Sequence, residues 1–247
     1  MSARQKLILS GLYFSKFDAA GLKSLGFASF AEAFNVIGYA LGARPASIKN
    51  YRDEFDPFFP NHRKGWHGRP IREYCRELYE HYKDLEQSDF TNLVRSFFGS
   101  TESETVGMSD ADQDDGNLVF MRRLVTGLAA EHYFESIWQG LPEFRGLMLE
   151  NTTAFGCGYD FRLRSEPQPQ SFLAVEVKGL MGPTGSLAMT PKEYGVASAL
   201  KNRFFLFIVT NFRDVPCHTI YQDPVNSVLN FRKIERVAVQ VSWLTSI

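Results

Sequence analysis

The chain is organised around Gly156-Cys157-Gly158-Tyr159-Asp160 and, a short gap later, Ala174-Val175-Glu176-Val177-Lys178-Gly179. Both stretches have the composition of β-strands. Side chains alternate between the two faces of a strand, so Glu176 and Lys178 project to one side while the valines beside them project to the other. If Asp160 lies on the neighbouring strand, two carboxylates and an ammonium converge on one point. The competing interpretation is a Glu/Lys pair on the surface of an edge strand.

Such a convergence has a specific chemical use. A pair of carboxylates is the ligand set that Mg²⁺ prefers, and the ion keeps water or phosphate on its remaining positions. A lysine beside the pair can orient an attacking water or stabilise the charge that develops on a phosphate.

The surrounding pattern predicts a mixed sheet flanked by helices. Asp160 begins one strand and Glu176 ends the next, and these positions are neighbours in an antiparallel hairpin. Thr190-Pro191-Lys192-Glu193 is a capping box with proline at the first helical position, so it predicts a helix start. The apolar run Phe204–Val209 is typical of a central strand that is buried on both faces. The expected elements are strands at 147–153, 159–164, 172–178, 204–210, 215–221 and 237–243, a helix at 191–200, and a short helix near Val225.

An amphipathic helix is expected before the sheet, from Leu118 to Trp138. At about 100° per residue, Glu131 falls on the same face as Leu124 and Leu128. A carboxylate on an apolar face is costly unless something pairs with it. Glu131 is therefore either directed at the metal site or placed at the edge of the apolar stripe with its carboxylate in water.

The N-terminal half predicts an all-α domain of the helix-turn-helix type. Helices are expected at 3–14, 29–41 and 71–98, and Gly42 ends the second of them. The segment after Gly42 is a short helix with many polar side chains, which is the arrangement of a DNA-reading helix in the major groove. An ordinary helical hairpin with a solvated face is the alternative. The expected DNA contacts of this segment are Arg44, Ser47, Lys49, Asn50 and Arg52.

Residues 55–70 interleave aromatic and basic side chains, and five Pro and Gly residues indicate a loop. Such a mixture suits a phosphate backbone and unstacked bases, although aromatic residues can equally fill the helical core. We expect the phenylalanines to pack inside and Arg63, Lys64 and Arg69 to contact phosphate.

The charge distribution divides the chain. The whole sequence has a net charge of -1, yet residues 100–117 hold six acidic residues and no Lys or Arg, so the remainder is net positive. This predicts a helical domain at 1–99, an acidic linker at 100–117 and a second domain at 118–247.

A calcium loop at 110–116 is rejected because its glycine comes one residue late and Met121 stands where a bidentate Glu is needed. The three widely spaced cysteines predict free thiols in a cytoplasmic protein, and no apolar run is long enough to predict a membrane span.

The order of elements, with Asp on one strand and Glu-x-Lys on the next, resembles the PD-(D/E)xK nuclease superfamily. Residues 118–215 look most like the domain named for the C-terminus of the plant NO VEIN protein, which also occurs in bacterial restriction and defence proteins. The resemblance rests on Glu131, Gly158-Tyr159-Asp160, Val175–Gly179, the Thr190-x-x-Glu193 helix start with Ala197, and Phe204–Val209. Tyr159 replaces the proline of the superfamily's Pro-Asp pair. The fold expected from this resemblance is a restriction-endonuclease-like α/β (α+β) sheet preceded by the all-α domain.

The resemblance implies a Mg²⁺-dependent DNA endonuclease of restriction or anti-phage defence, in which Mn²⁺ is expected to substitute. Asp160 and Glu176 would bind the metal, Lys178 would assist the attacking water, and Glu131 would be a further catalytic or metal ligand. Double-stranded DNA is the expected partner, and cutting both strands with one site per chain favours a homodimer. The alternatives are a nuclease-fold DNA-binding module and a subunit that is inactive until a partner such as a helicase or ATPase gates it.

Overall fold

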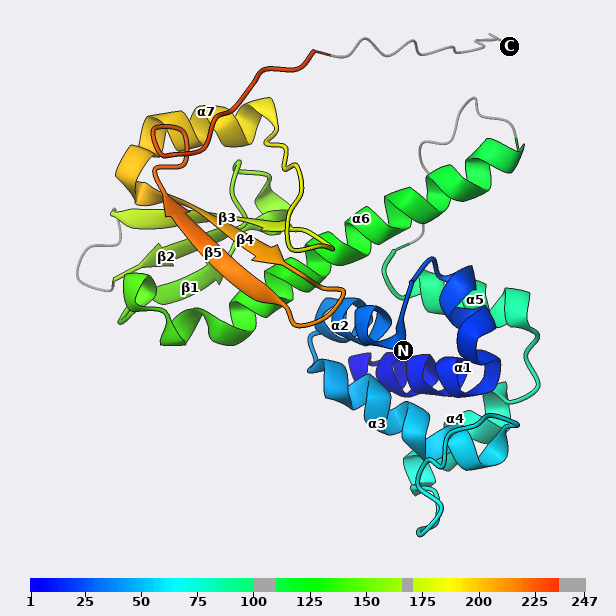
Figure 1. Ribbon diagram of the computed structural model, residues 1–247. Helices are drawn as coiled ribbons and strands as arrows, with labels where there is room; N and C mark the ends of the chain where they lie inside the picture. Colours follow the sequence, from blue (N-terminus) through cyan, green and yellow to red (C-terminus); the bar gives the residue numbers. More distant parts are fainter. Residues whose placement is uncertain (100–109, 166–170, 236–247) are drawn as a thin grey trace, which may run out of the picture.

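The computed structural model describes residues 1–99, 110–165 and 171–235, and it describes the side chains of these residues except at 110–121. It has a mixed α and β architecture, with a helical part followed by a five-stranded sheet (Figure 1). The strands lie in the order β1-β2-β3-β4-β5, and only the β3/β4 pair is parallel. Their bounds are Met148–Asn151, Phe161–Arg164, Phe172–Gly179, Phe204–Thr210 and Cys217–Gln222.

Two helices cover the two faces of the sheet. Helix α6 (Asp110–Ile137) packs on one face, where Phe134 meets Phe207 at a ring-centroid distance of 4.9 Å. Helix α7 (Pro191–Leu200) packs on the other, through Ala197 against Ala174 and Phe204. Helix α7 also provides the crossover between the parallel strands β3 and β4. The apolar run of β4 is buried on both faces as expected.

Helix α6 lies unusually close to the end of β3. A Cβ atom at Gly179 would stand 2.7 Å from the carbonyl oxygen of Thr126, so glycine is required for this approach. The contact brings the middle of α6 beside the end of the strand that carries Glu176 and Lys178.

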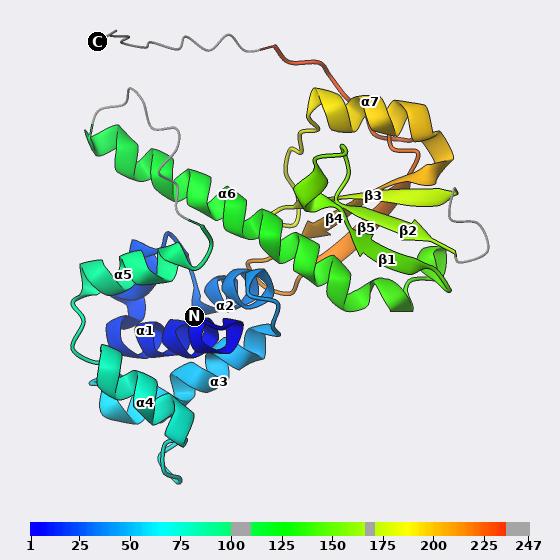
Figure 2. The same cartoon turned by 180° about the vertical axis from the view of Figure 1, so that it is seen from behind.

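The N-terminal bundle is built around α1, whose residues Leu9, Leu12, Tyr13 and Phe14 are completely buried. Figure 2 shows the other helices arranged about it, with α2 nearest to α6. The five helices are α1 (Ala3–Ser24), α2 (Phe30–Ala40), α3 (Pro45–Phe55), α4 (Glu73–Tyr82) and α5 (Gln87–Ser96).

The bundle is joined to the sheet part by polar contacts. The Asn35 side chain on α2 donates to the carbonyl oxygens of Phe212 and Asp214, at 2.9 and 2.6 Å, in the loop after β4. Arg122 on α6 forms an ion pair of 2.9 Å with Glu32 on α2. No helix in the described segments is both long and apolar enough to cross a bilayer.

Four expectations about the elements are corrected. The first helical segment extends to Ser24, well beyond residue 14, with a kink at Asp18, where φ is 45°. The long helix expected at 71–98 is two helices, because the chain turns back after Tyr82 and the Lys16 ammonium binds the carbonyl oxygens of Lys83 and Leu85. Helix α6 begins at Asp110, inside the expected linker, while 100–109 lie outside the described residues. Residues near Val225 form a turn, and the strand expected at 237–243 lies outside the described residues.

Candidate active site

Asp160 and Glu176 are neighbours across the β2/β3 pair. Phe161 is paired with Val175, and the Asp160 N–H donates to the Val175 carbonyl oxygen at 3.0 Å, which continues the ladder by one residue. The Asp160 carboxylate accepts a hydrogen bond of 2.8 Å from the Val177 N–H. This bond fixes the orientation of Asp160 beside the strand that carries Glu176. The adjacency expected from the hairpin is confirmed.

Lys178 lies between two carboxylates. Its Nζ is 2.5 Å from Glu176 Oε1 and 2.8 Å from Glu193 Oε2. Glu193 is the third residue of α7, where it completes the predicted capping box by accepting the Thr190 N–H at 3.1 Å. One carboxylate therefore both caps α7 and holds the ammonium of Lys178, so the start of the helix positions the lysine.

These side chains face a cavity of about 1000 Å³ between α6, the end of β3 and the start of α7. Glu131 lines it from α6, so all four residues expected to carry the chemistry share one cavity. The lining includes Arg122, Arg123, Thr126, Gly127, Glu131, Asp160, Glu176, Lys178, Gly179, Met181 and Glu193. The interpretation of Glu176 and Lys178 as a surface pair is excluded, because Glu176 is 3% exposed.

The cavity concentrates negative charge. Burial and the neighbouring Asp160 raise the pKa of Glu176 to about 8. Burial, with Asp160 and Glu135 nearby, raises the pKa of Glu131 to about 7. Burial also raises the pKa of Asp160, against the opposing effects of the Val177 N–H and Lys178. Burial alone would lower the pKa of Lys178, but Glu176 and Glu193 raise it above its ordinary value.

The donor set fits a hard divalent cation. Asp160, Glu176 and Glu131 supply carboxylate oxygens, and burial raises the pKa of each, so a divalent cation beside them would favour their ionised forms. Within the described part of the chain, no three His, Cys, Asp or Glu side chains are already gathered at metal-binding spacing. Binding an ion therefore requires the carboxylates to come closer together.

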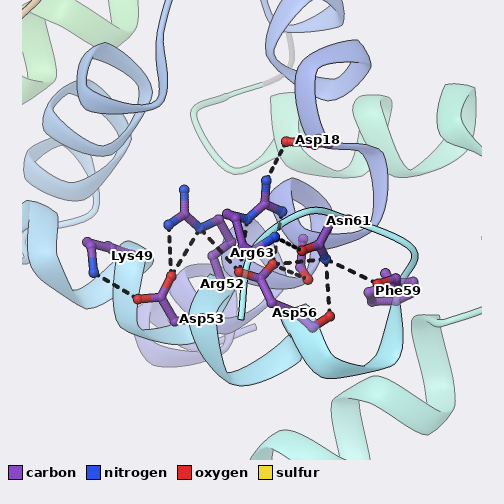
Figure 3. A network of polar contacts seen from close by, with 9 residues as sticks. Asp18, Lys49, Arg52, Asp53, Asp56, Phe59, Asn61 and Arg63 are labelled. Atoms are coloured by element: carbon purple, nitrogen blue, oxygen red, sulfur yellow. Dashed lines mark hydrogen bonds and ion pairs between the residues drawn. The ribbon is translucent and has the colours of Figure 1, made fainter. Parts of the chain in front are cut away.

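Two of the basic residues expected to contact DNA are committed to ion pairs inside the bundle (Figure 3). The Arg52 side chain is 10% exposed and bonds Asp53. Arg63 bonds both Asp56, at 2.9 Å, and Asp18. Buried carboxylates need such partners, so these guanidinium groups serve the fold.

The other expected DNA contacts lie in varied surroundings. Lys49 pairs with Asp53 one turn along α3. Arg69 stacks over the Trp66 ring at 3.9 Å. Ser47 is half-buried, whereas Arg44, Asn50 and Lys64 are exposed. None of the eight lines the cavity at β3, and DNA binding by these residues stays a prediction.

Three charged residues of the cavity were not predicted as site residues: Glu193, Arg122 and Arg123. Glu193 was predicted only as part of the capping box of a helix. Its separation from Lys178 along the sequence does not indicate that the two side chains meet. Arg123 lies eight residues before Glu131, two steps of four along one row of the same helix, a signal that helical periodicity could have provided. Arg122 is nine residues from Glu131, half a turn away by the same periodicity, so the sequence pattern gave no sign of it.

Residues 138–222 match the family model described as "Protein NO VEIN, C-terminal". The matched range contains Asp160, Glu176, Lys178 and Glu193, whereas Glu131 and the two arginines precede it. No curated protein and no solved structure matches the chain.

Proposed function

We propose that the protein is a Mg²⁺-dependent endonuclease that hydrolyses phosphodiester bonds in DNA, in a role of restriction or anti-phage defence. The main support for this proposal is that Asp160, Glu176, Lys178 and Glu131 line one cavity. The match of residues 138–222 to the NO VEIN C-terminal family model agrees with it, because the same range contains the Asp and Glu-x-Lys residues that resemble PD-(D/E)xK nucleases.

Each residue has a distinct part in the reaction. Asp160 and Glu176 would hold Mg²⁺, with Glu131 as a further ligand or as the acceptor of a hydrogen bond from water. When bound, the ion would polarise the scissile phosphate and favour ionisation of a water molecule. Lys178 would donate hydrogen bonds to the attacking water or to the phosphate oxygens as negative charge develops there. Water would add across the phosphodiester bond and leave a phosphate monoester and a hydroxyl group.

Glu193 is a positioning residue in this scheme. Because Glu193 also holds Lys178 Nζ, at 2.8 Å, Lys178 would keep a defined place if Glu176 turned toward the ion. The ammonium then remains beside the reacting phosphate.

Cleavage of supercoiled plasmid tests the proposal. Wild-type protein with Mg²⁺ is expected to nick or linearise the plasmid, and Asp160→Asn is expected to abolish cutting while the protein stays folded. Glu143→Gln is the matched control, because this exposed carboxylate lies on a short turn before β1, outside the cavity. Equal cutting by wild type and Asp160→Asn would refute the assignment.

A partner-gated nuclease subunit is the second candidate. It is favoured by the contact between Lys178 and Glu176, which occupies a metal-binding carboxylate in the isolated chain. Wild-type protein that binds Mg²⁺ and DNA but cuts nothing would support this candidate. Restored cutting after addition of a helicase or ATPase partner would then establish it.

A further inference from the structure

Three residues of α6 form one row along the cavity. Arg123, Gly127 and Glu131 are spaced by four positions, and all three line the cavity. The rise of an α-helix is about 1.5 Å per residue, so the row extends about 12 Å from the arginine to the carboxylate. A nucleic-acid strand advances about 3.4 Å per nucleotide, so the row matches about three to four nucleotides.

Gly127 has no side chain, so nothing projects from the helix between Arg123 and Glu131 in this row. Glycine within a helix is unfavourable, because it exposes the backbone and gains no side-chain contact. At Gly179 close packing explains the glycine, but a Cβ atom at Gly127 would meet nothing within 4 Å. Packing therefore does not require glycine here. Its effect is to keep the helix surface between Arg123 and Glu131 clear of side chains.

Positive charge lies at the far end of the row. Arg122 uses one nitrogen to bind Glu32, whose own carboxylate is buried and also accepts the Ala28 N–H. A guanidinium group has five N–H donors, so Arg122 keeps donors for a second acceptor. Arg123 beside it is exposed. Glu32 of the helical bundle thus holds Arg122 at the cavity, whereas Arg123 is open to solvent.

We propose that the row Arg123–Gly127–Glu131, together with Arg122, binds the backbone of the DNA strand that continues from the scissile phosphate. We call this binding surface the track. The proposal rests on the proposed function and deepens it. The strand backbone follows the row along α6 and passes over Gly127, and Arg122 and Arg123 bind phosphates about three to four nucleotides from the scissile bond. The substrate is therefore a polynucleotide that extends at least this far to one side, and a dinucleotide is too short.

Fluorescence anisotropy with a labelled DNA duplex, measured in EDTA at several salt concentrations, tests the track without cleavage. Gly127→Leu places a large side chain on the track but suits a helix, and it is expected to weaken binding about tenfold. Arg123→Ala is expected to weaken binding and to reduce the slope of log K against log salt by about one. Gly127→Ala adds only a methyl group, so it should raise the melting temperature and keep affinity near wild type.

Arg145→Ala is the charge-matched control, because Arg145 is exposed before β1 and does not line the cavity. Folded Gly127→Leu with wild-type affinity would overturn the track, as would wild-type protein that does not bind DNA at low salt. If the plasmid is cut but Gly127→Leu binds normally, the nuclease stands and the track fails. If Gly127→Leu loses binding but wild type cuts nothing, the track stands and the proposal that the chain cuts DNA without a partner fails.

Discussion

Replacement of Glu131 by glutamine is expected to stabilise the metal-free protein. Burial and the neighbouring carboxylates raise the pKa of Glu131 from 4.5 to about 7. At pH 8 the native state must keep this carboxylate ionised in an unfavourable place, whereas the unfolded chain ionises it freely. The pKa difference between the two states corresponds to at most about 3 kcal/mol in the free energy of unfolding. Because Glu131 is partly exposed to solvent, we expect Glu131→Gln to raise this free energy by about 1–3 kcal/mol.

The gain should depend on pH with a definite sign. A carboxyl group with a raised pKa in the native state destabilises that state as pH rises from the unfolded pKa to the folded one. Glu131→Gln should therefore match wild type near pH 4.5, gain stability up to pH 7 and stay constant above it. For a chain of this size the gain at pH 8 is a rise in melting temperature of roughly 2–10 °C.

Thermal melts in EDTA at pH 5, 6, 7 and 8 measure this effect. Glu77→Gln is the matched control, because Glu77 is exposed on α4 and the same substitution there changes no buried charge. Equal melting temperatures of wild type and Glu131→Gln at pH 8 would refute the reasoning, as would a gain of the same size at pH 5. Added Mg²⁺ should raise the melting temperature of wild type more than that of Glu131→Gln, because only wild type keeps the full ligand set.

Three further predictions concern the fold. Gly179→Val forces a Cβ atom toward the Thr126 carbonyl oxygen, 2.7 Å away, and should cost about 2 kcal/mol or more in urea unfolding; wild-type stability would contradict the close packing of α6. Arg72→Ala leaves the buried Glu54 carboxylate without its main partner and should cost about 3 kcal/mol at pH 7. Because Arg72 lowers the pKa of Glu54 below 4.5, this cost should shrink as pH falls below that value, and a cost unchanged at pH 3 in thermal melts would exclude the ion pair as its source. Asn35→Leu removes the donor to two carbonyl oxygens after β4 and should speed amide hydrogen exchange at 211–214, whereas unchanged exchange would show that this contact does not hold the loop.

Local sequence patterns were sufficient for the strands of the site. The period of two along β3 placed Glu176 and Lys178 on one side, and the capping box set the start of α7. The uninterrupted apolar run identified β4 as a buried strand. These features depend on side-chain direction and on hydrogen bonds within a few residues, which the order of amino acids specifies directly.

The N-terminal basic residues show what such patterns leave open. Arg52 and Arg63 were expected to contact DNA, and this stays a prediction. In the structure Arg52 binds Asp53, and Arg63 binds Asp56 and Asp18, all within the bundle. The sequence alone does not distinguish a basic residue that binds phosphate from one that pairs with a carboxylate brought near by folding. The break before α5 has a similar origin, because the Lys83 and Leu85 carbonyl oxygens there accept hydrogen bonds from the Lys16 ammonium, far away in the chain.

Taken by itself, the sequence determined which side chains point the same way on each element and that Asp160, Glu176 and Lys178 belong to one hairpin. Tertiary structure alone decided that α6 crosses the end of β3 closely enough to bring Glu131, Gly127 and the two arginines to the same cavity. It also decided that Glu193 holds Lys178. The physical reason is that periodicity fixes direction within an element, whereas adjacency between elements follows from long-range packing of their apolar faces.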